Sequence, residues 1–337
     1  MDVFGDGLRD VDFDEAVYPP VVTARAKALR EDPASASSWT TNHKPVIELI
    51  LLRFGVVTFR GFGLRAARDF DAFLSSFEGH GAGYAGGTSP RGAVSGRVMQ
   101  STQAPPDREI LLHQEMAYTR DFPKRLAFFC EVPPESGGET LIGDMRRFTR
   151  EVPNAFFDRV KRLGVRYVRR FRHPDWMPGH PDLDLLHRSW ADAFGSESRE
   201  EAEAACLATG SDCVWTPHGL EASFVTKGYE IHPQTGEEIW FNVIPAFDLN
   251  AVSQGQRFQA LHEEFYGTEH PWPQAVMFGD GSEISPQEIA ALYPVMNAAT
   301  TAPKWQHGDV QLLDNILTGH GRATFTGQRL VRVMLLA

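Results

Sequence analysis

The chain has 337 residues, 42% of them hydrophobic and 11% aromatic, so it can bury a large core as one large domain or two. Its formal net charge is -11, and no dense Lys/Arg cluster offers a phosphate-tracking surface, which argues against nucleic acid as a partner. The apolar runs are too short to span a bilayer, and the acidic N-terminus lacks the apolar stretch of a signal peptide, so we expect no membrane partner.

The cysteines are Cys130, Cys206 and Cys213. An odd, sparse set without metal-binding spacing is typical of free thiols in a reducing compartment. We therefore expect a soluble, cytoplasmic protein.

The first part of the chain predicts an irregular leader over residues 1–40, containing a short helix at 22–30. Apolar residues at helical spacing predict helices over 44–53 and 67–77, and Gly55 separates the first of these from a buried strand at 56–59. The glycine-rich segment 80–96 lacks a phosphate-loop pattern. A surface loop is the favoured interpretation, and a lid over a site is the alternative.

The remaining elements alternate between strand and helix. Strands are predicted at 126–130 and 139–142; helices at 152–163, 199–208, 254–266 and 285–297; short strands at 165–171, 224–225 and 239–242; and closing strands at 310–314 and 329–336. The last helix opens on Ser285-Pro286-Gln287-Glu288, a capping box with proline at the first helical position. With neither a repeat nor a clear linker, we expect one domain over 1–337, with a helical insertion at about 150–300.

One short stretch carries the chemistry. His113 and Glu115 are spaced i, i+2, which puts both side chains on one face of an extended strand but on diverging faces of a helix. The pair can therefore share a metal only on a strand or on a loop leaving one. Alone, such a pair is common by chance. A third donor, His320, would complete the two-His, one-carboxylate face of a non-heme Fe(II) oxygenase.

His113 and His320 lie far apart in the chain, with the predicted insertion between them. A jelly-roll barrel can place an early strand beside a late one, with a small-molecule site in its mouth. We therefore expect an α+β fold with a double-stranded β-helix core, flanking helices and the insertion.

Several stretches, taken in order, resemble the taurine dioxygenase superfamily of Fe(II)/2-oxoglutarate oxygenases. They look closest to the branch near clavaminate synthase, which hydroxylates amino acids on natural-product pathways. The stretches are residues 55–62, 113–118, 123–144, 233–242, 305–315, 320–322 and 325–329. The resemblance implies that His113, Glu115 and His320 are the catalytic iron ligands, with 2-oxoglutarate and O2 taking the open positions. Related halogenases lack the carboxylate, so Glu115 implies oxygen insertion or a related C–H oxidation.

The distal carboxylate of 2-oxoglutarate requires a bidentate cation, which Arg provides and Lys does not. Arg329 and Arg332 both follow His320, and their separation of three positions puts them on opposite faces of a strand. The family pattern favours Arg329, leaving Arg332 as a surface charge or a second substrate contact. Thr140 matches the position whose hydroxyl helps hold the same carboxylate; otherwise it is an ordinary β-branched strand residue. Arg322 either binds a substrate carboxylate or is a solvated charge at a strand end.

The expected function is hydroxylation of an amino acid or amino-acid-derived substrate, free or tethered to a carrier protein, with release of succinate and CO2. Two alternatives remain: a sulfonate or sulfate-ester dioxygenase, and a non-catalytic binding protein on the same barrel. The sequence does not determine the substrate or the oligomeric state.

Overall fold

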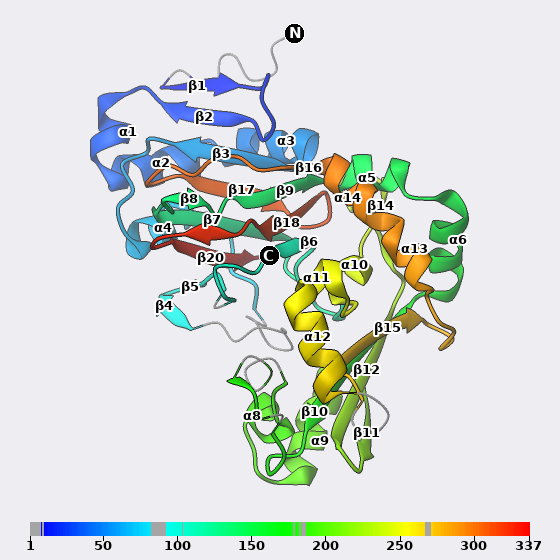
Figure 1. Ribbon diagram of the computed structural model, residues 1–337. Helices are drawn as coiled ribbons and strands as arrows, with labels where there is room; N and C mark the ends of the chain where they lie inside the picture. The colour runs from blue at the N-terminus through cyan, green and yellow to red at the C-terminus, as the bar shows by residue number, and fades with distance from the viewer. Residues whose placement is uncertain are drawn as a thin grey trace.

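The computed structural model describes residue 8 and residues 10–81, 92–102, 104–177, 179–181, 183, 187–266 and 271–337. It is a mixed α/β structure built on several sheets (Figure 1). None of the described helices is long and apolar enough to cross a bilayer.

The largest sheet, here called the major sheet, has eight strands. Their order is β1 (Val11–Asp14), β2 (Val21–Ala24), β3 (Val56–Arg60), β17 (Val310–Asp314), β7 (Arg125–Val132), β20 (Leu330–Leu336), β5 (Val98–Gln100) and β4 (Ala93–Ser95). Strands β17 and β20 come from the end of the chain but flank β7, both antiparallel to it. The two ends of the chain therefore meet in one sheet, as the barrel hypothesis requires.

A second, minor sheet carries the candidate site. Its order is β16 (Thr300–Thr301), β9 (Thr140–Asp144), β18 (Thr318–Arg322) and β6 (Ile110–His113). A separate two-stranded sheet pairs β19 (Phe325–Thr326), just after β18 in the chain, with β8 (Ser136–Gly137), just before β9. An apolar cluster joins the two sheets, because Ile142 of β9 shares it with Phe128 of β7, Leu313 of β17 and Val333 of β20.

Helices cover the face of the major sheet that is turned away from the minor sheet. They are α1 (Lys27–Glu31), α2 (Pro33–Asn42), α3 (Lys44–Phe54) and α4 (Ala67–Phe73). Phe70 and Phe73 of α4 share a buried cluster with Phe129 of β7 and Met334 of β20. Alternate residues of β7 and β20 thus face the helices or the minor sheet, as the period of a strand dictates.

The first 40 residues differ from the expectation. Where an irregular leader with a helix at 22–30 was predicted, the structure has β1, β2, α1 and most of α2. Strand β2 pairs parallel to β3, so this segment extends the major sheet. Val22 is fully buried by that pairing, a long-range contact that local helical spacing does not reveal.

The segment at about 150–300 contains strands as well as helices. Its helices are α5 (Met145–Glu151), α6 (Asn154–Leu163), α8 (Trp190–Phe194), α9 (Arg199–Ala208), α10 (Ile244–Phe247), α11 (Ala251–Gln254), α12 (Gln256–Phe265), α13 (Pro286–Ala290) and α14 (Leu292–Ala299). Its strands are β10 (Val165–Arg172), β11 (Asp212–Thr216), β12 (Gly219–Thr226), β15 (Gln274–Phe278), β13 (Tyr229–Ile231) and β14 (Glu238–Trp240). Strands β11, β12, β10 and β15 form a sheet of their own, and the strands predicted at 165–171 and 224–225 belong to β10 and β12 of this sheet.

Local signals were more reliable. Helix α9 has the predicted bounds, and the capping box at Ser285 opens α13 with Pro286 at its start. The glycine-rich segment 80–96, interpreted as a surface loop or alternatively as a lid, falls mostly on residues 82–91, which lie outside the described residues.

The prediction of free thiols is wrong for two of the three cysteines. Cys206 and Cys213 form a disulfide, while Cys130 is buried and free. The chain turns from the end of α9 into β11 and brings the two Cα atoms within 6.6 Å, inside the range that a disulfide spans.

Candidate metal centre

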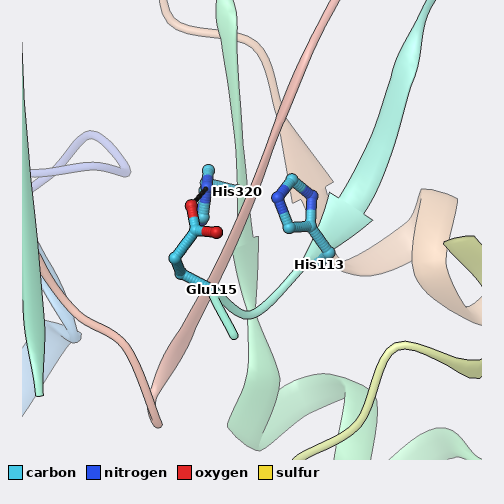
Figure 2. Close-up of side chains that lie close together, drawn as sticks. All are labelled: His113, Glu115 and His320. Carbon is cyan, nitrogen blue, oxygen red and sulfur yellow. Dashed lines mark ion pairs between the residues drawn. The ribbon is translucent and has the colours of Figure 1, made fainter. Parts of the chain in front are cut away.

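Three side chains converge where β6 meets β18. His113 is the last residue of β6, Glu115 lies in the turn that follows, and His320 is at the middle of β18, directly opposite His113. Their donor atoms all lie within 4.8 Å of one another (Figure 2). The sequence required a strand, or a loop leaving one, for the pair to share a metal, and this is what the structure has.

Hydrogen bonds and packing orient the two rings. His113 Nδ1 lies 2.9 Å from the Leu111 carbonyl oxygen. Because that oxygen can only accept, Nδ1 carries the proton and Nε2 keeps its lone pair for a metal. His320 lies between the His113 ring, at 4.3 Å between centroids, and the Phe128 ring, at 5.1 Å.

The donor set fits iron. His320 Nε2 is 3.5 Å from Glu115 Oε2, and these residues are only 4% and 2% exposed. Two imidazoles and one carboxylate on one face are the ligands of non-heme Fe(II) oxygenases. His320 Nδ1 is also buried without a hydrogen-bond partner among the described residues.

Arg329 and Arg332 face different surroundings. Arg329 donates from Nε to the Gly138 carbonyl oxygen at 2.7 Å, and burial, with a contribution from neighbouring Arg322, lowers its pKa to about 10. Arg332 instead pairs with Glu131 at 2.6 Å. It alternates with Val331 and Val333, which face the minor sheet, so Arg332 lies on the helix-covered side.

Thr140 and Arg322 lie opposite each other on β9 and β18. Thr140 is 2% exposed and Arg322 is 4% exposed, so the interpretation of Arg322 as a solvated charge is wrong. Its guanidinium donates to the carbonyl oxygens of Ala104, Pro105 and Arg108. Arg322 therefore holds the loop that leads into β6 in place through hydrogen bonds to its backbone.

Sequence reasoning gave Arg108 no role. Burial lowers the pKa of its guanidinium, which lies 5.4 Å from the centre of the Phe258 ring of α12. Among the described residues, the Arg108 side chain has no hydrogen-bond or ion-pair partner. Its position just before β6 was the available signal, but one basic residue in a loop does not stand out.

The histidines of the insertion lie in polar stretches of the sequence, a context that favours exposure. His232 and His187 are instead buried, at 1% and 5% exposure. His232 Nε2 lies 3.1 Å from Asp314 Oδ2, at the end of β17. Polar neighbours in the sequence therefore do not predict that a histidine side chain is exposed.

Comparison with known proteins agrees with this geometry. Residues 19–335 match the family described as taurine catabolism dioxygenase TauD, TfdA family. The dapdiamide synthesis protein DdaC of Enterobacter agglomerans is 30% identical over 296 residues, covering 88% of this chain and 85% of that protein. A clavaminate synthase-like protein of Arabidopsis thaliana is 28% identical over 328 residues, covering 96% and 93%.

Solved structures show the same fold. PvcB, described as an Fe, alpha-ketoglutarate dependent oxygenase from an isonitrile synthetic pathway, superposes with a TM-score of 0.51 at 12% identity, covering 97% of this chain and 92% of that one. The PvcB protein from Pseudomonas aeruginosa gives 0.50 at 13% identity with the same coverage.

The chain belongs to the TauD/TfdA dioxygenase family. The superfamily and branch expected from the sequence are confirmed, as is the class of enzyme. It is a non-heme iron dioxygenase that depends on 2-oxoglutarate and O2, and the half-buried His113 together with the buried Glu115 and His320 fits that iron.

Proposed function

We propose that this protein uses Fe(II), 2-oxoglutarate and O2 to hydroxylate an unactivated C–H bond of an amino acid or amino-acid-derived substrate in natural-product biosynthesis. The convergence of His113, Glu115 and His320 within 4.8 Å carries the proposal, with these three as the iron ligands. The relative named for dapdiamide synthesis supports the pathway class. When bound, iron with 2-oxoglutarate would activate O2, so that one oxygen atom enters the C–H bond and the other enters the succinate that leaves with CO2.

In this proposal the major and minor sheets are the two halves of a double-stranded β-helix, and the whole chain is one oxygenase domain. Their shared apolar cluster, with Ile142 on one side and Phe128 on the other, supports it. Localisation in the cytoplasm stays a prediction.

Arg329 and Thr140 are the proposed partners of the distal carboxylate of 2-oxoglutarate. Nε of Arg329 is taken by Gly138, and its two Nη groups have no partner among the described residues. Arg329 lies beside Cys130, whereas His320 touches Phe128. Residues 128 and 130 are two positions apart on β7, about 7 Å at the rise of a strand, a separation that a short diacid can span.

The substrate class draws support from the cations beside the site. Arg322 is held to carbonyl oxygens, and burial, together with the nearby positive charge of Arg108, lowers the pKa of Arg322 to about 10. A partly desolvated guanidinium without an acidic partner, next to an aromatic ring, suits a carboxylate. We place the substrate carboxylate at Arg108, since Arg332 is already paired with Glu131.

A substrate screen tests the function. Purified protein with Fe(II) and 2-oxoglutarate is given free amino acids and, separately, the carboxamide of each. We expect succinate release together with the gain of one oxygen atom in at least one free acid, and weaker turnover of its amide. Arg108→Met should reduce turnover of the acid and leave that of the amide. Succinate release no higher than that of His113→Ala with every compound would contradict the hydroxylase assignment.

The same screen separates free from tethered substrates. A carrier thioester has no carboxylate, so Arg108 would be of no use to it. Equal turnover of acid and amide would remove the role of Arg108 and favour a tethered substrate.

A further inference from the structure

The side chain of Asn315 brackets the backbone of a proposed iron ligand. Asn315 is fully buried, and its Oδ1 accepts from the Glu115 N–H at 2.8 Å. Its Nδ2 donates to the carbonyl oxygens of Glu115 at 2.9 Å and of Pro123 at 2.8 Å. One side chain therefore holds both backbone groups of Glu115, and these partners allow only one orientation of the amide.

The backbone just after Glu115 needs such support. Met116 has φ of 58°, the left-handed region, and it is the non-glycine residue with positive φ in the described part of the chain. That conformation is unfavourable for a residue with a Cβ and persists only where its surroundings impose it. The Glu115 carbonyl belongs to the peptide that precedes Met116. The bond from Asn315 Nδ2 therefore restrains the rotation that sets this φ.

Asn315 also connects Glu115 to the strand of the third ligand. It follows Asp314, whose Oδ1 accepts from the N–H groups of Ile316 at 2.9 Å and Leu317 at 3.0 Å. Gln114 Nε2 donates to the Ile316 carbonyl oxygen at 2.7 Å. This rigid segment continues directly into β18, which carries His320.

We propose that Asn315 is a positioning residue for the metal centre. It holds Glu115 and the left-handed Met116 in place, so that the carboxylate faces His320 before a metal enters. The inference rests on the proposed role of Glu115 as a ligand. It adds that the geometry of this ligand depends on a residue 200 positions away that does not itself bind the metal.

Metal affinity of the apoprotein tests this without any turnover. Mn(II), a stand-in for Fe(II), is titrated and free Mn(II) is followed by electron paramagnetic resonance. Asn315→Ala should lower the affinity about 10–100-fold, as is usual when a residue that orients a metal ligand is lost. Asn315→Asp keeps the size and the acceptor but loses both donor bonds. It should also weaken binding, despite an added negative charge that attracts cations.

Asn242 provides a matched control. It is a buried asparagine whose Nδ2 donates to the Gly228 carbonyl oxygen at 2.8 Å and whose Oδ1 accepts from the Ile244 N–H at 3.2 Å. Asn242→Ala should lower the melting temperature comparably and leave Mn(II) affinity within a few-fold. Equal Mn(II) affinity of Asn315→Ala and the wild type, or equal losses in both alanine variants, would overturn the proposal. No Mn(II) binding by the wild type would overturn the ligand assignment on which it rests.

Glycine at position 116 gives a rescue experiment. Glycine adopts positive φ without strain, but Met116 is only 1% exposed in an apolar cluster, so the Mn(II) affinity of Met116→Gly alone is measured first as a separate reference. In the Asn315→Ala background, Met116→Gly should restore part of the lost affinity, because glycine adopts the positive φ at position 116 without the support of Asn315. A simple sum of the two single effects would overturn the coupling between Asn315 and Met116.

Discussion

At the scale of single residues, the candidate centre is prepared by the protein before a metal arrives. His113 has its tautomer set by the Leu111 carbonyl, and His320 is packed between two rings. Glu115 lies 2% exposed within reach of His320. The negative charge of a buried carboxylate is stabilised when a divalent cation binds to it. Each of these side chains should therefore matter more for activity than for folding.

We expect His113→Ala, Glu115→Ala and His320→Ala to abolish succinate release while leaving the protein folded. Each change removes one of the three proposed ligands, and none removes a residue of the apolar clusters. His307, an exposed histidine beside Glu131, provides the control, and His307→Ala should keep wild-type activity. Succinate assays and circular dichroism melts check this. Near-full activity in any of the three would show that its residue is not a ligand.

The two arginines that follow His320 should fail in different ways. Arg329→Ala removes one side of a proposed buried pair, at a cost of about 3–5 kcal/mol. That is roughly two to three and a half decades of affinity for 2-oxoglutarate. Arg329→Lys should recover only part, since an ammonium cannot form two parallel bonds.

Arg332→Ala should leave the 2-oxoglutarate requirement within a few-fold. It should instead cost about 1–3 kcal/mol of stability, because Glu131 loses its partner. Titrating 2-oxoglutarate against succinate, alongside thermal melts, separates the two effects. A large shift in the requirement for Arg332→Ala, with none for Arg329→Ala, would reverse the assignment.

At the scale of elements, the pairing of β18 with β6 sets the distance between the two histidines. Its register shifts between His320 and Arg322, so Gly321 lies at the irregularity. A Cβ added at Gly321 would meet the Ile110 carbonyl oxygen, a backbone atom that cannot turn aside. On the neighbouring glycine, Gly319, a Cβ would lie 2.9 Å from Leu112 Cγ. These glycines let β18 approach β6 closely enough for His113 and His320 to share one metal.

Gly321→Ala should therefore separate β18 from β6. We expect the free energy of unfolding to fall by about 1–3 kcal/mol, as at other overpacked sites, and the melting temperature to fall with it. Mn(II) binding should be at least tenfold weaker. Gly81 has open space where a Cβ would go, and Gly81→Ala is the matched control. Unchanged Mn(II) affinity in Gly321→Ala would show that the close approach of the strands is not needed.

At the scale of the whole molecule, the chemical state of each of the three cysteines depends on the fold. Cys130 lies inside β7, where burial raises the pKa of its thiol to about 12. The raised value means that the neutral thiol is favoured in the folded state. This contribution to stability is complete below the ordinary thiol pKa and is lost as the pH rises toward 12. Cys206 and Cys213 are joined in the disulfide between α9 and β11.

Thiol counting at pH 8 follows from this. The native protein should show no reactive thiol, because only a thiolate reacts and Cys130 is both buried and neutral. Denaturation without a reductant should expose one thiol per chain, and denaturation after reduction should expose three. Ellman's reagent gives each count. Three thiols without reduction would show that Cys206 and Cys213 are not joined.

Much of the architecture was already predictable from the sequence because its signals are local. Apolar periodicity predicted α3, α9, β3, β7 and β17, and the capping box predicted the start of α13. The i, i+2 spacing of His113 and Glu115 determined that only a strand, or a turn leaving one, could bring both side chains to one metal. The resemblance to the oxygenase superfamily pointed to His320 among twelve histidines as the third donor, and side-chain chemistry named arginine as the partner of a distal carboxylate.

Tertiary structure decided what depends on pairing between distant segments. It joined β2 to β3, buried Arg322 against the loop before β6, and put Arg332 on the helix-covered face beside Glu131. It also brought Asn315 to the backbone of Glu115 and Cys206 to Cys213. Residue type and period restrict each segment to a few conformations. Strand register, and with it the direction in which a buried side chain points, emerges only when the sheets assemble, because a shift of one residue moves every side chain to the other face.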